Sequence, residues 1–351
     1  MAWQGIEGHD AVVERFVRAE AQGRLAGTYL FIGPPGVGKG CFALALARAL
    51  VCEAARPGLL PCDACASCIQ AAAGTHPDID VVRKPEDRAS IPLEAFIGDQ
   101  QHRMREGLCW RLLLRPALGT RKVAVILDAD HLLDEAANCL LKTLEEPPPG
   151  AVIILVGTAL ERQLPTIRSR CQTIRFGRLA PESITRILGR EAEAAGVQID
   201  ADRLAASVAS SGGSLDRARL LLDPDLGGFR ATLLGLLGRR PLAGVALARE
   251  TIAIMEAAGK EAPARRARLR MAFDAAIEFY RAALRDDAQP GPGDPLLGRA
   301  VAAWNGDREA AAEGLAITLD AIDALERNAN LTVLVDAWTA GLEDPRVARS
   351  S

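Results

Sequence analysis

This sequence has few aromatic residues, few histidines and little net charge, and each of these shortages excludes some classes of protein. Phenylalanine, tryptophan and tyrosine make up only 4% of the 351 residues, a composition that leans helical. The formal net charge of −3 gives no overall nucleic-acid signature, so any contact with DNA must come from a local patch or from partners. No ordered Ser/His/Asp or Cys/His set indicates covalent catalysis. We expect the four histidines to be ordinary surface or boundary residues: His9, His76, His102 and His131.

Long apolar runs are missing as well. The longest, such as residues 152–156, are far too short to span a membrane, and residues 1–5 lack the basic and apolar regions of a signal peptide. We therefore expect a cytoplasmic, reducing location, in which cysteines bind metal or stay free rather than pair. With 49% hydrophobic and 25% charged residues, the composition is typical of a globular protein of two or three domains.

Short apolar runs alternate with helical patterns in the first half of the chain. We predict strands over 28–32, 123–127 and 152–156, and helices over 12–21, 41–51 and 133–144. Apolar strands that alternate with helices indicate a mostly parallel sheet covered on both faces. After residue 176 the strand signals end. There we expect short helices over 181–195, 202–210 and 214–222, a break at 223–228, and then helices rich in Ala and Leu.

The first predicted strand leads into Gly33-Pro34-Pro35-Gly36-Val37-Gly38-Lys39-Gly40, a phosphate-binding loop with one departure from the pattern. The pattern G-x-x-x-x-G-K is followed by Ser or Thr, whose hydroxyl holds Mg²⁺, but here the position is Gly40. We expect the backbone amides of residues 36–39 to cradle phosphate and the Lys39 ammonium to meet the β- and γ-phosphates. The strand before the loop and the helix after it favour a phosphate loop over an ordinary glycine turn. Gly40 leaves open whether ATP or ADP binds.

An acidic segment follows the second predicted strand. Asp128 ends that strand and is placed to hold Mg²⁺ through water. Hydrolytic sites of this kind carry an acidic residue next, to polarise the attacking water, and Ala129 cannot do so. Asp130 is one residue too far along and should point elsewhere. A second interpretation is that Asp130 and Asp134 cap helix N-termini, and both interpretations can hold together.

Four of the eight cysteines are closely spaced. Cys52, Cys62, Cys65 and Cys68 form C-x9-C-x2-C-x2-C in a segment that contains Pro and Gly. Four thiolates at this spacing suit a tetrahedral structural Zn²⁺ site without a water position, and the alternative is four reduced thiols in a loop. We expect the other four to be buried free thiols: Cys41, Cys109, Cys139 and Cys171.

A lone arginine stands in Ser169-Arg170-Cys171, just after the third predicted strand. On physical grounds alone, such an arginine is most often a solvated charge or one half of a local ion pair. The functional alternative is an arginine finger that reaches a phosphate bound by a neighbouring subunit.

Taken in order, these motifs strongly resemble bacterial clamp-loader subunits of the AAA+ class. The phosphate-loop helix is followed by the cysteine set, and the acidic strand by the particularly specific string Leu140-Leu141-Lys142-Thr143-Leu144-Glu145-Glu146-Pro147-Pro148; Ser169-Arg170-Cys171 then completes the series. The resemblance is good over residues 1 to about 222. It implies an α/β AAA+ P-loop domain with a parallel sheet over 1–177, including a zinc insertion at 52–68. A small helical lid over 178–223 and an all-helical C-terminal collar domain over 224–351 would follow.

Within that family, the ATP-hydrolysing motor type needs Ser or Thr at position 40 and Glu at position 129, and this chain has neither. It is therefore similar to the delta-prime class of DNA polymerase III clamp loaders, and the resemblance implies that Arg170 acts as a finger in trans. Thr158 matches the family's polar sensor position, although a strand-end hydroxyl is an equally simple interpretation. Relatives carry a sensor arginine in G-S-x-R, whereas here Arg217 is shifted by one residue, so it either faces the site or caps a helix.

The implied function is that of a largely non-hydrolysing stator in the polymerase holoenzyme. It would assemble with other clamp-loader subunits into a hetero-oligomeric ring, and through that complex act on the sliding clamp and primer–template DNA. Two alternatives stay open. Because Lys39 is retained, the chain could be an active ATPase motor subunit. It could also be a zinc-dependent DNA-binding module, against which the net charge argues.

Overall fold

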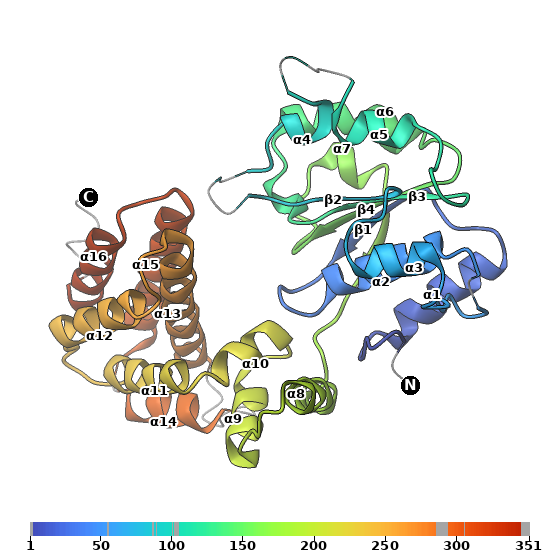
Figure 1. The fold of residues 1–351 in the computed structure, drawn as a ribbon. Helices are drawn as coiled ribbons and strands as arrows, with labels where there is room; N and C mark the ends of the chain where they lie inside the picture. The colour runs from blue at the N-terminus through green and yellow to red at the C-terminus, as the bar shows by residue number, and fades with distance from the viewer. Residues whose placement is uncertain are drawn as a thin grey trace. The chain divides into compact units, whose positions relative to one another are not determined.

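The computed structural model describes residues 3–54, 56–85, 88, 90–99, 101, 105–285, 294–304 and 306–344 (Figure 1). The chain divides into two compact units, which are taken separately here. The first consists of residues 1–194 and 213–216, and the second of residues 195–212 and 217–351. Within the described ranges, no helix combines the length and the apolar character that crossing a membrane requires.

The first unit is built on a five-stranded parallel sheet in the order β2-β3-β4-β1-β5. The strands are β1 (Thr28–Ile32), β2 (Ile79–Val82), β3 (Lys122–Ile126), β4 (Ala151–Gly157) and β5 (Gln172–Arg175). The three predicted strands are confirmed to within one residue at each end. Sequence analysis missed β2 and β5, the two outer strands. Each has only one fully buried residue, so neither shows the continuous apolar run of a central strand.

Helices cover both faces of this sheet, as predicted (Figure 1). On one face lie α1 (Asp10–Ala21), α2 (Lys39–Val51) and α3 (Ala66–Ala72), and on the other α4 (Glu94–Ile97), α5 (Gly107–Leu113), α6 (Asp134–Glu145) and α7 (Pro165–Arg168). Because side chains alternate along a strand, β1 contributes to both layers. Leu30 joins the aliphatic core under α4–α7, whereas the Phe31 ring packs against the rings of Phe16 and Phe42.

The parallel arrangement gives the sheet two chemically different ends. All carboxyl ends of the strands point one way, and in open parallel sheets ligands bind outside that end. Here this carboxyl end carries the loop after β1, the short helix η1 (Ala129–His131) after β3, and Thr158 after β4. The opposite, amino end carries the segments that lead into the strands, including Arg170 before β5.

Every element described after residue 176 is a helix, as predicted. These are α8 (Pro181–Ala195), α9 (Ala201–Ser210), α10 (Leu215–Leu221), α11 (Pro224–Leu237), α12 (Gly244–Glu256), α13 (Ala262–Ala283), α14 (Pro295–Ala303), α15 (Arg308–Glu326) and α16 (Leu331–Glu343). Where we expected a break at 223–228, helix α11 runs through the two glycines. It starts at Pro224, a position where proline's missing N–H costs nothing. The division into lid and collar domains stays a prediction.

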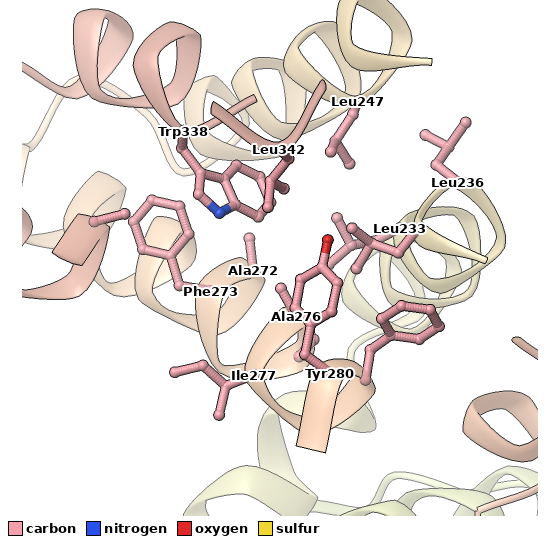
Figure 2. Close-up of a cluster of buried hydrophobic side chains, with 14 of the residues drawn as sticks. Leu233, Leu236, Leu247, Ala272, Phe273, Ala276, Ile277, Tyr280, Trp338 and Leu342 are labelled. Atoms are coloured by element: carbon pink, nitrogen blue, oxygen red, sulfur yellow. The ribbon is translucent and has the colours of Figure 1, made fainter. Parts of the chain in front are cut away.

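The second unit has its own core around α13 (Figure 2). The fully buried Phe273, Ala276 and Tyr280 lie on one face of this helix. Helix α15 approaches closely at Gly314, where a Cβ would lie 2.5 Å from the Tyr280 ring. The Trp338 indole N–H donates to the Thr318 hydroxyl at 3.1 Å, so the largest buried side chain has its polar atom satisfied.

Candidate functional site

The predicted phosphate loop lies at the carboxyl end of the sheet, between β1 and α2. Gly36 and Gly38 have φ angles of 72° and 92°, in the left-handed region that favours glycine. A Cβ at Gly33 would overlap the carbonyl oxygen of Phe176, so close backbone approach requires glycine there as well. The backbone thus has the features of a phosphate loop, in the strand–loop–helix context that the sequence predicted.

The loop's lysine, however, is bonded to the loop itself. Lys39 is 6% exposed, and its Nζ donates to the carbonyl oxygens of Gly33 and Pro34, both at 2.6 Å. Burial lowers the pKa of Lys39 to about 8, and the nearby carboxylates of Asp130 and Asp216 partly oppose that shift. The ammonium predicted to meet phosphates already has oxygen partners and negative charge from this chain.

Residues 213–216, which end in Asp216, lie against the same loop. The Leu215 N–H donates to the Gly36 carbonyl oxygen at 2.8 Å. A Cβ added at Gly36 would overlap the Ser214 hydroxyl and lie 3.2 Å from Asp216 Oδ2. Sequence analysis missed this contact. The signal was present, because Asp216 occupies the place where the resembled family carries its sensor arginine.

The departure at Gly40 is not forced by crowding. The nearest atom that a Cβ there would meet is Leu127 Cδ2 at 3.4 Å, an ordinary van der Waals contact. Asp128 follows as an exposed residue at the end of β3, with a φ of 57°. The structure therefore leaves space for a hydroxyl side chain at position 40, and the Asp128 carboxylate is exposed; a hydroxyl and a carboxylate are the ligands that a Mg²⁺ site of this type uses.

Asp130 has a different role from the one expected. Its carboxylate accepts the backbone N–H of Thr158 at 2.9 Å and the Thr158 hydroxyl at 2.6 Å, and the Gln163 amide donates to it as well. It ties the end of β3 to the end of β4. The predicted capping is wrong, because η1 and α6 have no side-chain cap; Asp134 is the first residue of α6, where its charge suits the helix N-terminus. Thr158, the candidate sensor, donates its hydroxyl to this link.

Two of the four histidines are buried, although we expected all four to be surface or boundary residues. His9 is 6% exposed, and its Nε2 lies 2.7 Å from the carbonyl oxygen of Val37 in the phosphate loop. His76 is 4% exposed, and its Nδ1 accepts the Asp78 N–H. His131, the last residue of η1, is half-buried. His102 lies outside the described residues. His9 is thus part of the loop's support, which no local pattern signalled.

The four closely spaced cysteines form a cluster that could hold a metal ion. Their Sγ atoms all lie within 4.8 Å of one another, with Cys52 and Cys65 4.0 Å apart and Cys62 and Cys68 3.9 Å apart. Four thiolates bonded to Zn²⁺ at about 2.3 Å have sulfurs about 3.8 Å apart, so the spacing fits. Backbone N–H groups of Ala64 and Cys65 lower the pKa of Cys62 to about 6, whereas burial raises the pKa of Cys52 and raises that of Cys68 to about 12.

The remaining cysteines are free thiols, as predicted, but not all are buried. Cys109 is buried, Cys139 and Cys171 are half-buried, and Cys41 is exposed. Burial raises the pKa of Cys171, which directly follows Arg170, to about 12, so this thiol stays protonated. It therefore packs as a small apolar group.

Arg170 lies at the amino end of the sheet, between α7 and β5. Its side chain is 28% exposed, and its Nε donates to Glu145 Oε1 at 2.7 Å. Its backbone is fixed to β1, because the Thr28 hydroxyl donates to the Arg170 carbonyl oxygen at 2.8 Å. The five residues of β1 span about 16 Å, so the guanidinium is separated from its own phosphate loop by more than an arginine side chain reaches.

Arg217, the displaced sensor candidate, forms an ion pair within the second unit. Its guanidinium donates to the Glu278 carboxylate on α13. The same carboxylate accepts from the buried Arg230, which also bonds to Asp294 Oδ2 at 2.5 Å. Arg217 therefore belongs to a network of alternating charges, and a nucleotide-sensing role stays a prediction.

Comparison with known proteins places these features in a family context. Residues 8–180 match the family described as DNA polymerase III, delta subunit. The chain is 33% identical over 223 residues to the delta' subunit of Escherichia coli DNA polymerase III, covering 63% of this chain and 61% of that protein. It is 36% identical over 161 residues to delta' of Bacillus subtilis, covering 46% and 45%.

A second group of relatives carries the name gamma/tau. The chain is 34% identical over 260 residues to the gamma/tau subunit of Mycobacterium tuberculosis DNA polymerase III, covering 72% of this chain and 43% of that protein. Across the three relatives named, the aligned region spans 43% to 61% of the relative's length. The matches thus concern shared parts of these proteins rather than their whole chains.

Proposed function

We propose that this chain is a delta-prime-like clamp-loader subunit, which lends Arg170 to a neighbour's ATP site instead of hydrolysing ATP itself; the support is its similarity to DNA polymerase III delta' subunits. The observation that carries the proposal is the position of Arg170. The guanidinium is part-exposed at the amino end of the sheet, out of reach of its own phosphate loop, with its backbone held by Thr28. An arginine in that position can stabilise transferring phosphate only when another subunit supplies the phosphate.

The chain's own loop supports the same proposal. Gly40 lacks the hydroxyl that binds Mg²⁺, and Ala129 lacks the carboxylate that polarises water. Lys39 is bonded to backbone carbonyls, with Asp216 nearby. On this proposal the chain is a stator in a cytoplasmic, hetero-oligomeric ring of clamp-loader subunits. Through that ring it contributes to loading the sliding clamp on primer–template DNA as part of the polymerase holoenzyme.

The test is Arg170→Ala in the assembled complex. We expect the ring to form normally, while hydrolysis at the ATP site that faces this chain slows by about a thousandfold, the scale of an arginine finger. Single-turnover ATP hydrolysis by the complex measures this. Arg168→Ala, an exposed arginine two residues earlier, is the matched control, and Lys39→Ala should also leave the rate unchanged. Unaltered hydrolysis at every site in the Arg170→Ala complex would sink the proposal.

Two observations favour the motor alternative: Gly40 has space around it, and Lys39 is retained. Calorimetry and a turnover assay on the purified chain with ATP and Mg²⁺ separate the two functions. The stator predicts weak or no binding and no turnover. Turnover that disappears in Lys39→Ala would establish the motor function instead.

We infer that the cysteine cluster holds a structural Zn²⁺ through Cys52, Cys62, Cys65 and Cys68. The support is the sulfur spacing and the all-thiolate donor set, which leaves no position for a catalytic water. Metal analysis of the purified chain should find one zinc, which Cys62→Ser loses and Cys41→Ser keeps. A chain that folds and assembles equally well without bound metal would contradict a structural role.

A further inference from the structure

The string that carried the family resemblance ends in Glu145-Glu146-Pro147-Pro148, and neither the phosphate loop nor the cysteine cluster uses it. In the structure α6 ends at Glu145, just before β4 begins. The end of this helix therefore lies at the amino end of the sheet, which is also where Arg170 lies. Two motifs that are 25 residues apart in the chain meet there.

The Glu145 carboxylate holds one side of the Arg170 guanidinium. Its Oε1 accepts from Nε at 2.7 Å and also from Nη2. The other side of the guanidinium, at Nη1, donates to the Thr166 carbonyl at 3.0 Å and to the Ser169 hydroxyl at 3.2 Å. An arginine has five side-chain N–H groups, and these bonds use four of them, so one Nη2 N–H is left over.

Stability does not account for this pair. Glu145 is 51% exposed and Arg170 28% exposed, and ion pairs of such exposure contribute only about 0–1 kcal/mol to folding. Orientation accounts for it better. A free arginine side chain has about 2 kcal/mol of rotamer entropy, which is lost when the group must meet a phosphate in one geometry. An arginine that is held in advance has already lost that freedom.

We propose that Glu145 is the positioning residue of Arg170, a proposal that rests on Arg170 acting as a finger in trans. The charged bond to Glu145 fixes the Nε side of the guanidinium. The bonds at Nη1 are to neutral oxygens, whereas those to Glu145 join two opposite charges, so the bonds at Nη1 are the easier ones to displace. When a neighbour's phosphate arrives, its oxygens displace Thr166 and Ser169 from Nη1 and take the remaining Nη2 N–H, while Glu145 stays in place.

A competing role for Glu145 predicts the opposite result. If the carboxylate only neutralised the arginine, its removal would free positive charge for the phosphate and hydrolysis would become faster. If it positions the arginine, its removal leaves the guanidinium free to rotate and hydrolysis becomes slower. The sign of the rate change therefore separates the two roles.

The experiment is Glu145→Gln in the assembled complex, with ATP hydrolysis measured at the site that faces this chain. We expect kcat to fall about tenfold, a fraction of the effect of losing the finger, while KM for ATP changes less than about twofold. Glu146→Gln is the matched control, since that side chain is exposed, adjacent and not bonded to Arg170. Glu145→Asp keeps the charge on a shorter side chain and should give an intermediate kcat, which a purely structural effect would not.

A double-mutant cycle with Arg170→Ala completes the test. Without the arginine there is nothing to position, so adding Glu145→Gln to Arg170→Ala should cause no further loss. An unchanged or faster rate in Glu145→Gln overturns the inference, as does an equal loss in both backgrounds. Either result leaves the proposed function standing if Arg170→Ala is slow. An Arg170→Ala complex with normal hydrolysis removes the proposed function itself.

Discussion

The two ends of one sheet carry basic side chains in opposite situations. At the carboxyl end, Lys39 is 6% exposed and bonded to carbonyl oxygens of its own loop. At the amino end, Arg170 is 28% exposed and held by a carboxylate on one side, with neutral oxygens on the other. The lysine lies in the recognisable phosphate-binding loop, yet the arginine is the more exposed of the two side chains.

The difference shows that a motif can keep its backbone conformation while losing the side chains that carry out its chemistry. The glycines of the phosphate loop keep the conformation, as the positive φ angles of Gly36 and Gly38 show. The hydroxyl at position 40 and the carboxylate at position 129 are missing, and Lys39 is already bonded within the chain. What a phosphate loop can do therefore depends on what surrounds its lysine. Here these are two carbonyl oxygens of the loop itself, together with the carboxylates of Asp130 and Asp216 from distant parts of the sequence.

Restoring the missing groups of the phosphate loop, at the carboxyl end of the sheet, would remove the difference between the two ends, and a large effect is expected. Gly40→Thr supplies the Mg²⁺ ligand in a position with room for it, and Asp216→Arg replaces a negative charge beside the loop with a positive one. Two recovered charge-assisted contacts are worth about 1.5 kcal/mol or more each, so affinity for ATP with Mg²⁺ should rise about a hundredfold.

Calorimetry on the purified double variant and on each single variant measures this gain. Asp216→Asn is the control that removes the charge without adding an arginine, and it should give a smaller gain. If the double variant binds ATP no better than the unaltered chain, then neither Gly40 nor Asp216 is what weakens nucleotide binding at this site.

A smaller effect, about 2 kcal/mol in the free energy of unfolding, should follow from the burial of Lys39 in its loop. Folding lowers the pKa of Lys39 from 10.5 to about 8, so between these values the unfolded chain binds more protons than the folded one. Stability therefore rises with pH in this range, and this group contributes about 2 kcal/mol between pH 8 and pH 10. Below pH 8 the full cost of burying the charge is present.

Urea unfolding of the chain and of Lys39→Met at both pH values isolates the contribution. Groups that titrate in both proteins, such as the cysteines, cancel in the difference. The increase due to Lys39 should be missing in the methionine variant. Equal pH dependence in the two proteins would mean that Lys39 is not held in the buried, bonded position described.

Sequence analysis predicted the features that depend on local pattern. The three central strands show as continuous apolar runs, and the glycine loop and the cysteine spacing are short-range signals. The outer strands β2 and β5 could not be found in this way, because each has one buried residue and an otherwise mixed pattern. Their assignment depends on pairing with β3 and β1, which the sequence does not state.

The sequence predicted which residues belong to the candidate site, but not which residues they contact. Asp130 is of a residue type that often caps helices, yet its carboxylate accepts a hydrogen bond from Thr158, which is 28 residues away. His9 and Asp216 approach the phosphate loop from opposite ends of the first unit's sequence. Such contacts are set by how the sheet and its flanking segments pack, so periodicity and spacing carry no signal for them.

The parallel sheet also gives this protein a direction. A subunit that receives catalytic help at one end and gives it at the other associates head to tail, through heterologous rather than self-complementary surfaces. If the phosphate loop at the carboxyl end does not hydrolyse ATP, this chain can supply an arginine to a neighbour's ATP site but cannot use one supplied by another neighbour. On the proposed function, a row of such subunits has a defined last member, and its direction follows that of β1, from Thr28 at the amino end to Ile32 at the carboxyl end.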